Sequence, residues 1–308
     1  MTRTSSARGY LMIAGAALLW GVSATGAKML LLQNVGTVLL VQTRVTFAFM
    51  GMAAVFALFR RELFRISSRH LRPVALMGII GIAGSNFTYY FAIREGTIAT
   101  AILLQYTAPL LVTAYMAVTH EEDLSPAKIV AAVMAVAGCA VAVGGFSHAI
   151  ENTSSAGLIS GVASAVCFAF MSISTRHVLT RVNVWTATLY ALLFASLFWA
   201  VVNPPWTVAA AHLPADLWLK LAGFAVVSVL IPHTLFFTGL QHVVPSRAMI
   251  ISTSEPVIAI GSAAALLGES LTALQIAGAA LVLAAITILQ IRREPGGEEL
   301  REEQDAAH

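Results

Sequence analysis

The chain has 308 residues, of which 58% are hydrophobic and 11% charged, and its formal net charge is +3. Soluble domains carry about a quarter charged residues, so this composition excludes an ordinary soluble globule. The small net charge gives no reason to expect a nucleic-acid partner. Two cysteines, Cys139 and Cys167, are too few for a disulfide framework or a cysteine-rich metal site.

Long apolar stretches follow one another along the whole chain. Each is long enough to cross a hydrocarbon layer of about 30 Å as a helix, and none shows the short alternating pattern of membrane strands. The sequence therefore predicts an all-α integral membrane protein with ten transmembrane helices. The expected spans are 9–31, 35–58, 72–93, 97–119, 126–145, 156–177, 184–203, 217–240, 245–267 and 271–291.

The positive charges predict the orientation, because Lys and Arg concentrate in cytoplasmic loops. If both termini are cytoplasmic, most Lys and Arg residues lie on that side, above all in the loop 60–72, RRELFRISSRHLR. Both termini are therefore expected in the cytoplasm. The charged tail 292–308 is expected to be a disordered cytoplasmic end.

The two halves of the chain align at an offset of 147 residues. Segment 75–137 matches 222–284 without a gap, so that Pro109 meets Pro256 and Glu122 meets Glu269. Each half holds five spans, and an odd number inverts the second half relative to the first. The sequence thus predicts two inverted five-helix repeats, 1–147 and 148–291, a layout typical of secondary transporters.

Polar groups in spans one to three are the first candidates for a binding site. Arg44 lies near mid-depth in span two, where an ionisable group costs at least ~2.5 kcal/mol and usually faces a wet interior. Trp20 in span one and Asn86 in span three lie at similar depth. Tyr89, later in span three, is expected either in the pocket or in the interfacial aromatic belt.

Span four and span nine each carry a proline inside an apolar stretch. Pro256 has no N–H, so the carbonyl near residue 252 should lose its helical partner, which is tolerated at membrane depth only beside protein or water. Pro109 repeats this feature. We therefore expect both helices to break beside a cavity whose wall carries Gln105 and Ser252.

Glu255 directly precedes Pro256 and is the second mid-depth charge. It is expected to bind substrate or to carry a coupling proton, and the alternative is a purely structural ion pair with Arg44. His233 in span eight is the counterpart of Asn86 under the repeat. Both are expected to line the pocket or, alternatively, to bond neighbouring helices.

Spans five and ten contain almost only Ala, Val, Leu, Ile and Gly. Ser125 is expected to cap span five, with Pro126 at its first position, and Thr272 with Gln275 to form a capping box on span ten. Without polar groups to place, these spans should be peripheral, either packing through small residues or forming a homodimer contact.

Three segments resemble one known family. ALLWGVSATGAK (17–28) resembles the opening span of the drug/metabolite transporter superfamily, EamA type, and 105–125 and 254–272 resemble its two repeated Pro-then-Glu blocks. The resemblance covers nearly the whole chain. It implies a ten-helix carrier of small metabolites in the bacterial inner membrane, with export favoured over import.

Motifs of other function classes are absent from the sequence. There is no HExxH, no GxSxG and no GxxxxGK[ST], and the eight His residues have no metal-ligand spacing. We therefore expect no enzyme activity, no cofactor and no metal. The predicted function is secondary transport of amino acids or related compounds by alternating access, and the alternative is a channel, receptor or accessory subunit without carrier activity.

Overall fold

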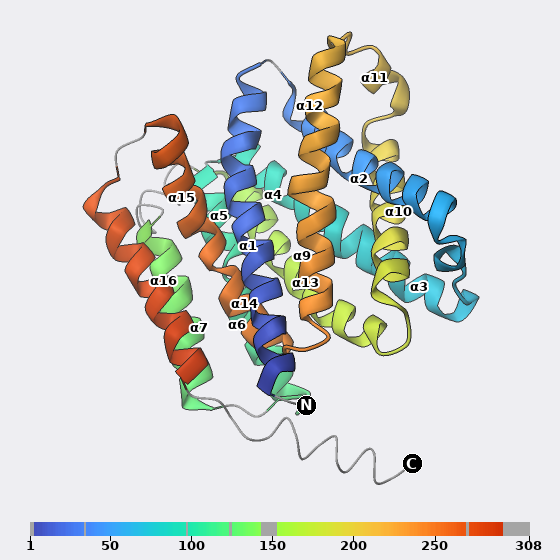
Figure 1. Cartoon of the computed structure of the whole chain (residues 1–308). Coiled ribbons are helices and arrows are strands. Elements are labelled where there is room, and N and C mark those ends of the chain that lie inside the picture. Colours follow the sequence, from blue (N-terminus) through green and yellow to red (C-terminus); the bar gives the residue numbers. More distant parts are fainter. Residues whose placement is uncertain are drawn as a thin grey trace, which may run out of the picture.

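The computed structural model describes residues 3–33, 35–96, 98–122, 125–142, 153–268 and 271–291 (Figure 1). Throughout these residues the regular secondary structure is helical. The Glu269 partner of Glu122 and the predicted tail lie outside the described residues. The first half holds α1 (Arg3–Leu31), α2 (Thr37–Phe59), η1 (Arg61–Phe64), α3 (Ser68–Leu76), η2 (Met77–Gly84), α4 (Ser85–Arg94), α5 (Ile98–Gln105), α6 (Ala108–Val118) and α7 (Pro126–Ala142).

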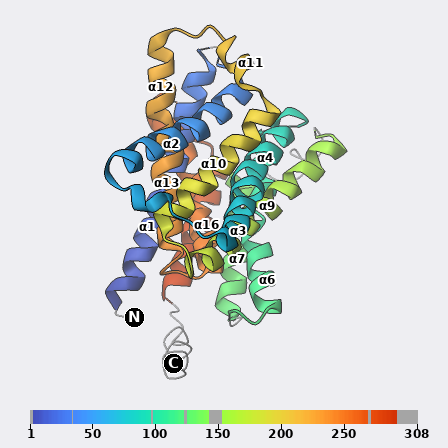
Figure 2. The same cartoon turned by 90° about the vertical axis from the view of Figure 1, so that its right-hand side faces the viewer.

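The second half follows the same order of long and interrupted helices. It holds α9 (Ser155–Leu179), α10 (Val184–Val202), α11 (Pro205–Ala209), α12 (Ala215–Ala225), η3 (Val226–Leu230), α13 (Ile231–Gly239), α14 (Pro245–Ser252), α15 (Ser254–Leu267) and α16 (Ala273–Ile291). α1 begins and α16 ends at the same end of the bundle (Figures 1 and 2).

Eight helical stretches are long and apolar enough to cross a membrane. They coincide with eight of the predicted spans, which confirms an integral membrane architecture for this part of the chain. Predicted spans five and ten are shorter apolar helices, Pro126–Ala142 and Ala273–Leu289. The total of ten spans stays a prediction.

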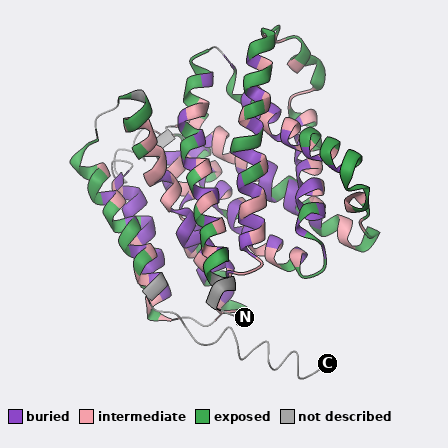
Figure 3. Cartoon of the chain, viewed as in Figure 1, coloured by how far each residue is buried: buried purple, intermediate pink, exposed green. Residues whose placement is uncertain are grey.

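The burial pattern fits a lipid-facing exterior. Buried residues gather where the helices face one another, while outward faces are exposed (Figure 3). Many exposed side chains are large and apolar, including Leu11, Val118 and Leu219 at 74%, 80% and 75% exposure. In water such faces would be unusual, whereas hydrocarbon covers them without cost.

α7 and α16 pack together along one side of the bundle (Figure 1). A Cβ added to Gly278 would lie 2.3 Å from the Ala142 nitrogen and 2.6 Å from the Gly138 carbonyl oxygen. The two backbones thus approach as closely as only glycine permits. The predicted packing through small residues is confirmed here. The homodimer contact stays a prediction.

Both predicted helix starts are present. The Ser125 hydroxyl accepts from the Lys128 N–H at 3.3 Å. Thr272 and Gln275 bond each other reciprocally, since the Thr272 N–H donates to Gln275 Oε1 at 2.9 Å and the Gln275 N–H to Thr272 Oγ1 at 3.2 Å. Local chain signals therefore begin α7 and α16 where expected.

Two helix breaks occupy corresponding places. α5 ends at Gln105 and α6 begins at Ala108, while α14 ends at Ser252 and α15 begins at Ser254. At each break a threonine hydroxyl bonds back three residues: Thr107 to the Leu104 carbonyl at 2.7 Å, and Thr253 to the Ile250 carbonyl at 2.5 Å. Such bonds from a side chain to a backbone carbonyl compete with the backbone hydrogen bonds of a helix.

The prolines follow these breaks instead of interrupting a continuous helix. Pro109 is the second residue of α6 and Pro256 is the third residue of α15. Both lie in the first turn of a helix, where a backbone N–H would have no acceptor within that helix. The predicted break beside Pro256 is therefore present, and it lies at Thr253, before the proline.

Two π-helical segments interrupt the third and eighth predicted spans, 72–93 and 217–240. η2 covers 77–84 and η3 covers 226–230. Shifting η3 back by 147 residues places it within η2. Segments of this kind are rare and frequently lie at functional sites. With the two helix breaks, they place four irregular backbone segments in the interior of the bundle.

Candidate functional site

The irregular segments surround a cavity of about 180 Å³ in the middle of the bundle, which we call the central cavity. This volume is enough for on the order of ten water molecules or a small metabolite. Its wall draws on α1, α2, η2, α4, α5, α9, η3, α13 and α15. The sequence-predicted residues that line it are Trp20, Arg44, Asn86, Tyr89, Gln105, His233, Glu255 and Pro256.

Arg44 enters the central cavity from α2. Its Nη2 donates to Asn86 Oδ1 at 3.1 Å, and Asn86 Nδ2 donates to the Ile82 carbonyl at 2.7 Å. Asn86 therefore orients the guanidinium from η2 and α4. The buried Nε of Arg44 has no hydrogen-bond partner among the described residues, so part of its planar donor set remains available.

Glu255 reaches the same cavity from the first turn of α15. Tyr106, at the opposite helix break, lines the same cavity. No cation of the described residues lies within 4.0 Å of this carboxylate. The predicted alternative of a contact ion pair with Arg44 is therefore not formed in this conformation, although both charges face one cavity.

Two buried hydroxyl groups add to the polar lining. Ser23 is 6% and Ser228 is 1% exposed, and neither Oγ has a partner within the described part of the chain. Both residues line the central cavity. Since buried polar groups are nearly always hydrogen-bonded, these two hydroxyls and Arg44 Nε are suited to water or a polar ligand.

His233 lies against the indole of Trp20, with ring centroids 5.3 Å apart and an interplanar angle of 79°. Its Nδ1 is 2.9 Å from the Val229 carbonyl oxygen. A carbonyl only accepts, so Nδ1 carries the proton and a neutral ring presents Nε2 as an acceptor. Trp20 also packs against Phe168 and Phe236, which gives one side of the cavity an aromatic wall.

The other predicted side chains differ in their placement. Gln105 Nε2 donates to Ser85 Oγ at 3.1 Å, which bridges α5 and α4. Tyr89 lines the cavity and packs edge-on against Tyr90 at 5.4 Å, in agreement with the pocket alternative. Pro109 does not line the cavity.

Ser252 does not line the cavity either, although the sequence placed it on the wall with Glu255. It is fully buried at the end of α14, and its hydroxyl donates to the Ala248 carbonyl at 2.9 Å. The reason is the break at Thr253: Ser252 and Glu255 belong to different helices, so the expectation of one continuous helical face is wrong.

Sequence reasoning missed four polar lining residues: Ser23, Ser85, Tyr106 and Ser228. Small hydroxyls are common in membrane helices and carry no strong signal. For Tyr106 a signal existed, because it stands in the middle of an apolar span next to Gln105. Within the described residues, no group of three or more His, Cys, Asp or Glu side chains is placed to hold a metal ion.

Comparisons with known proteins agree with this architecture. The model of the EamA-like transporter family matches twice, at residues 7–144 and 155–291. The chain is similar to the uncharacterized inner membrane transporter YicL of Salmonella typhimurium, with 23% identity over 93% of this chain and 96% of that protein.

Two similar proteins are named as exporters. The threonine/homoserine exporter RhtA of Salmonella typhimurium is 24% identical over 80% of this chain and 81% of its own. The aromatic amino acid exporter YddG of Ancylobacter novellus is 32% identical over 44% of this chain and 48% of its own.

A solved crystal structure superposes with a TM-score of 0.77 at 21% sequence identity, covering 94% of this chain and 98% of that one. This likeness concerns the fold alone. The family model, however, matches most of the chain in two consecutive copies. The protein belongs to the EamA-like transporter family.

Proposed function

We propose that this transporter exports small zwitterionic metabolites, such as amino acids, from the cytoplasm by alternating access around the central cavity. The observation that carries the proposal is the separation of charge: Arg44 and Glu255 line one small cavity without forming a contact pair. A carboxylate fits the guanidinium of Arg44, and an ammonium group fits the carboxylate of Glu255.

The rest of the lining fits such a substrate. The unpartnered hydroxyls of Ser23 and Ser228 and the Nε2 of His233 supply further polar contacts. The Trp20 wall supplies an apolar and aromatic surface for a side chain. Relatives named as exporters of threonine and homoserine and of aromatic amino acids support this substrate class and the direction of transport.

Alternating access in this proposal depends on ten spans in two inverted halves. α7 and α16 then also cross the membrane. Support comes from the matching positions of the two helix breaks and the two π-helical segments, each pair separated by the offset that aligns the halves of the sequence. Exchanging the conformations of two such halves opens the cavity to alternate sides.

A polar cluster supports a state closed at the end where α1 begins. Glu122, after α6, accepts from the Ser246 hydroxyl and N–H at the start of α14. Lys128 of α7 lies 3.6 Å from the same carboxylate, and the two side chains are 5% and 6% exposed. At this end, Glu122 thus ties the segment after α6 to α14 by hydrogen bonds and to α7 by a buried ion pair.

Further bonds close the same end. Arg176 Nη1 of α9 donates to the carbonyls of Leu240 and Val243 at 3.0 and 3.3 Å, and Arg247 Nη1 donates to the Tyr10 hydroxyl at 2.8 Å. The α1 residues that line the central cavity run from 20 to 27, so the cavity extends toward the opposite end. We infer a conformation shut toward the cytoplasm.

The substrate is best identified by comparing intracellular and external metabolites of cells with and without the protein. The proposal expects one or a few amino-acid-like compounds to be depleted inside and enriched outside when it is present. An Arg44→Gln variant, expressed and inserted to the same level, should match the cells that lack the protein. Changes confined to compounds without a carboxylate would contradict the proposed chemistry.

A further inference from the structure

A second, larger cavity opens on the side of the bundle between α3, α6 and α9; we call it the lateral groove. Its volume is about 740 Å³, and it shares no lining residue with the central cavity. Its apolar lining includes Leu76, Leu111 and Val166, which are 38%, 38% and 52% exposed. The lateral groove therefore faces the surroundings of the protein, not its interior.

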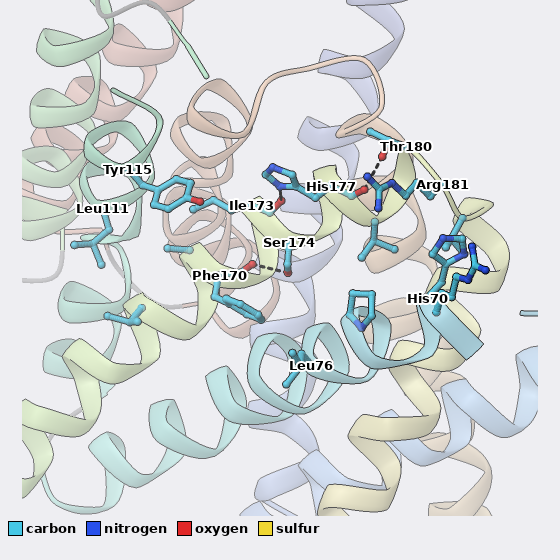
Figure 4. A pocket seen from close by; sticks show the side chains of 16 residues that line it. His70, Leu76, Leu111, Tyr115, Phe170, Ile173, Ser174, His177, Thr180 and Arg181 are labelled. Carbon is cyan, nitrogen blue, oxygen red and sulfur yellow. Dashed lines mark hydrogen bonds between the residues drawn. The ribbon is translucent and has the colours of Figure 1, made fainter. Parts of the chain in front are cut away.

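The lateral groove is basic at one end and apolar along the rest. His177 and Arg181 lie at the end of α9 with His70 across from them at the start of α3, while Phe170, Leu111 and Leu76 lie further along (Figure 4). The candidate crossing that contains α3 begins at Ser68, and the one formed by α9 ends at Leu179. The basic end is thus at the level of a membrane surface, and the apolar part lies at hydrocarbon depth.

The arginines of the basic end have no counterion among the described residues. His177 pairs with Glu121 at 3.4 Å. Across the described residues, by contrast, no hydrogen bond or ion pair involves the side chain of Arg69, His70 or Arg181. In addition, Ser67 caps α3 without a side-chain hydrogen bond, so the positive end of that helix adds to the attraction for an anion.

A smaller polar cavity of about 260 Å³ continues from the basic end. It shares His70, Arg181 and Val182 with the lateral groove. Ser67, Asn183 and Arg65 contribute to its lining, as does Glu62, whose carboxylate is paired with Arg60 at 3.4 Å. His70 and Arg181 therefore stand between a polar compartment and an apolar one, which is the arrangement that suits an amphiphile.

We propose that the lateral groove binds an anionic phospholipid of the surrounding bilayer. Its phosphate lies against Arg69, His70 and Arg181, its polar headgroup enters the smaller cavity, and one acyl chain runs along Leu111 and Phe170. Basic pockets between transmembrane helices attract such headgroups. A neutral lipid would not use the arginines, and a free phosphorylated metabolite would not use the apolar length of the lateral groove.

The test measures lipid binding to the purified full-length protein in neutral detergent, by native mass spectrometry with three probes. These are phosphatidylglycerol, phosphatidylcholine of the same acyl chains, and glycerol 3-phosphate. Phosphatidylglycerol should bind most tightly, and Arg69→Gln/Arg181→Gln should weaken it about 30-fold, or about fivefold per arginine. The matched control is Arg60→Gln/Arg61→Gln, which also removes two positive charges, at residues that line neither the lateral groove nor the smaller cavity, and should leave binding unchanged.

A second variant tests the apolar part. Leu111→Trp fills the apolar part of the lateral groove and keeps every arginine. It should weaken phosphatidylglycerol binding and leave the weaker binding of glycerol 3-phosphate unchanged. Arg181 is exposed beyond the end of α9, so the single Arg181→Gln variant serves if the double one is poorly folded. Equal binding of the two lipids, equal loss in the control, or glycerol 3-phosphate binding as tightly as the lipid would overturn the proposal.

Discussion

Arg44 and Glu255 face the same central cavity from α2 and α15 without forming a contact ion pair. Arg44 instead donates a hydrogen bond to Asn86 Oδ1 at 3.1 Å. Two opposite charges at mid-depth cost free energy unless something bridges or solvates them. A zwitterion placed between them would satisfy both, and this relationship leads to the first two predictions.

Arg44→Gln should weaken binding of an amino acid substrate by about 10- to 100-fold, because a hydrogen bond to a charged group contributes about 1.5–3 kcal/mol. Arg44→Lys should recover only part of the loss, since an ammonium lacks the planar fork. Affinity is measured by concentration-dependent flux into vesicles. The internal control is the matching amine without a carboxylate: if its affinity falls as much as that of the amino acid, Arg44 does not recognise the carboxylate.

Glu255→Gln should weaken binding of the same amino acid by a similar factor. Binding of the keto acid analogue, which lacks the ammonium group, should be unchanged. If Glu255 also carries the coupling proton, the variant should lose the pH dependence of flux while folding and inserting normally. Flux is compared across a pH series with an imposed proton gradient. A variant with the pH profile of the wild type would remove the proton role and leave only the substrate contact to be judged.

Glu122→Gln should open the end of the bundle at which α1 begins. It removes the carboxylate charge that lies 3.6 Å from the buried Lys128 ammonium, and breaking a buried pair costs about 3–5 kcal/mol. Access is followed with a membrane-impermeant thiol reagent and a Ser23→Cys probe, after replacing Cys139 and Cys167. Labelling from that face should be faster in the variant.

The control for this experiment is Glu62→Gln, which removes an exposed pair with Arg60 at 3.4 Å. Exposed pairs contribute about 0–1 kcal/mol, so labelling should keep its wild-type rate. If Glu122→Gln labels no faster than this control, the polar cluster does not close the cavity.

Gly278→Ala should destabilise the protein by about 1–3 kcal/mol, the usual cost of overpacking. The added methyl would press on backbone atoms of Ala142 and Gly138, which cannot rotate away. Gly223→Ala is the matched control, because nothing lies within 4 Å of its added Cβ and alanine is the better helix former. Thermal midpoints in detergent should fall for the first variant alone; equal midpoints would show that α7 and α16 tolerate separation.

Much of the fold could be predicted from apolar length. The stretches that became α2, α9 and α10 are apolar over the thickness of a membrane and have turn signals at their ends, so their bounds agree with expectation to within about two residues. The π-helical segments could not be predicted. No residue in 77–84 forces that geometry, which depends on packing against the neighbouring helices α9 and α10.

The residues of the candidate site could be predicted where burying the side chain in the membrane costs free energy. Arg44, Glu255 and His233 stand out because a charged or titratable group inside a span needs a reason, and the structure brings all three to one cavity. Ser252 was misplaced because threonine back-bonding at 253 ends the helix before the proline does. Ser23 and Ser228 were missed because a serine can also bond its own helix and leave no need for a cavity.

The most direct test is counterflow in sealed vesicles that contain the purified protein. Vesicles loaded with an unlabelled amino acid identified as substrate receive a trace of the labelled compound outside. A carrier with the central cavity as its binding site should give a transient, saturable accumulation of label that is lost in Arg44→Gln and in Glu255→Gln. Flux that does not saturate, or accumulation that is the same in both variants as in the wild type, would contradict it.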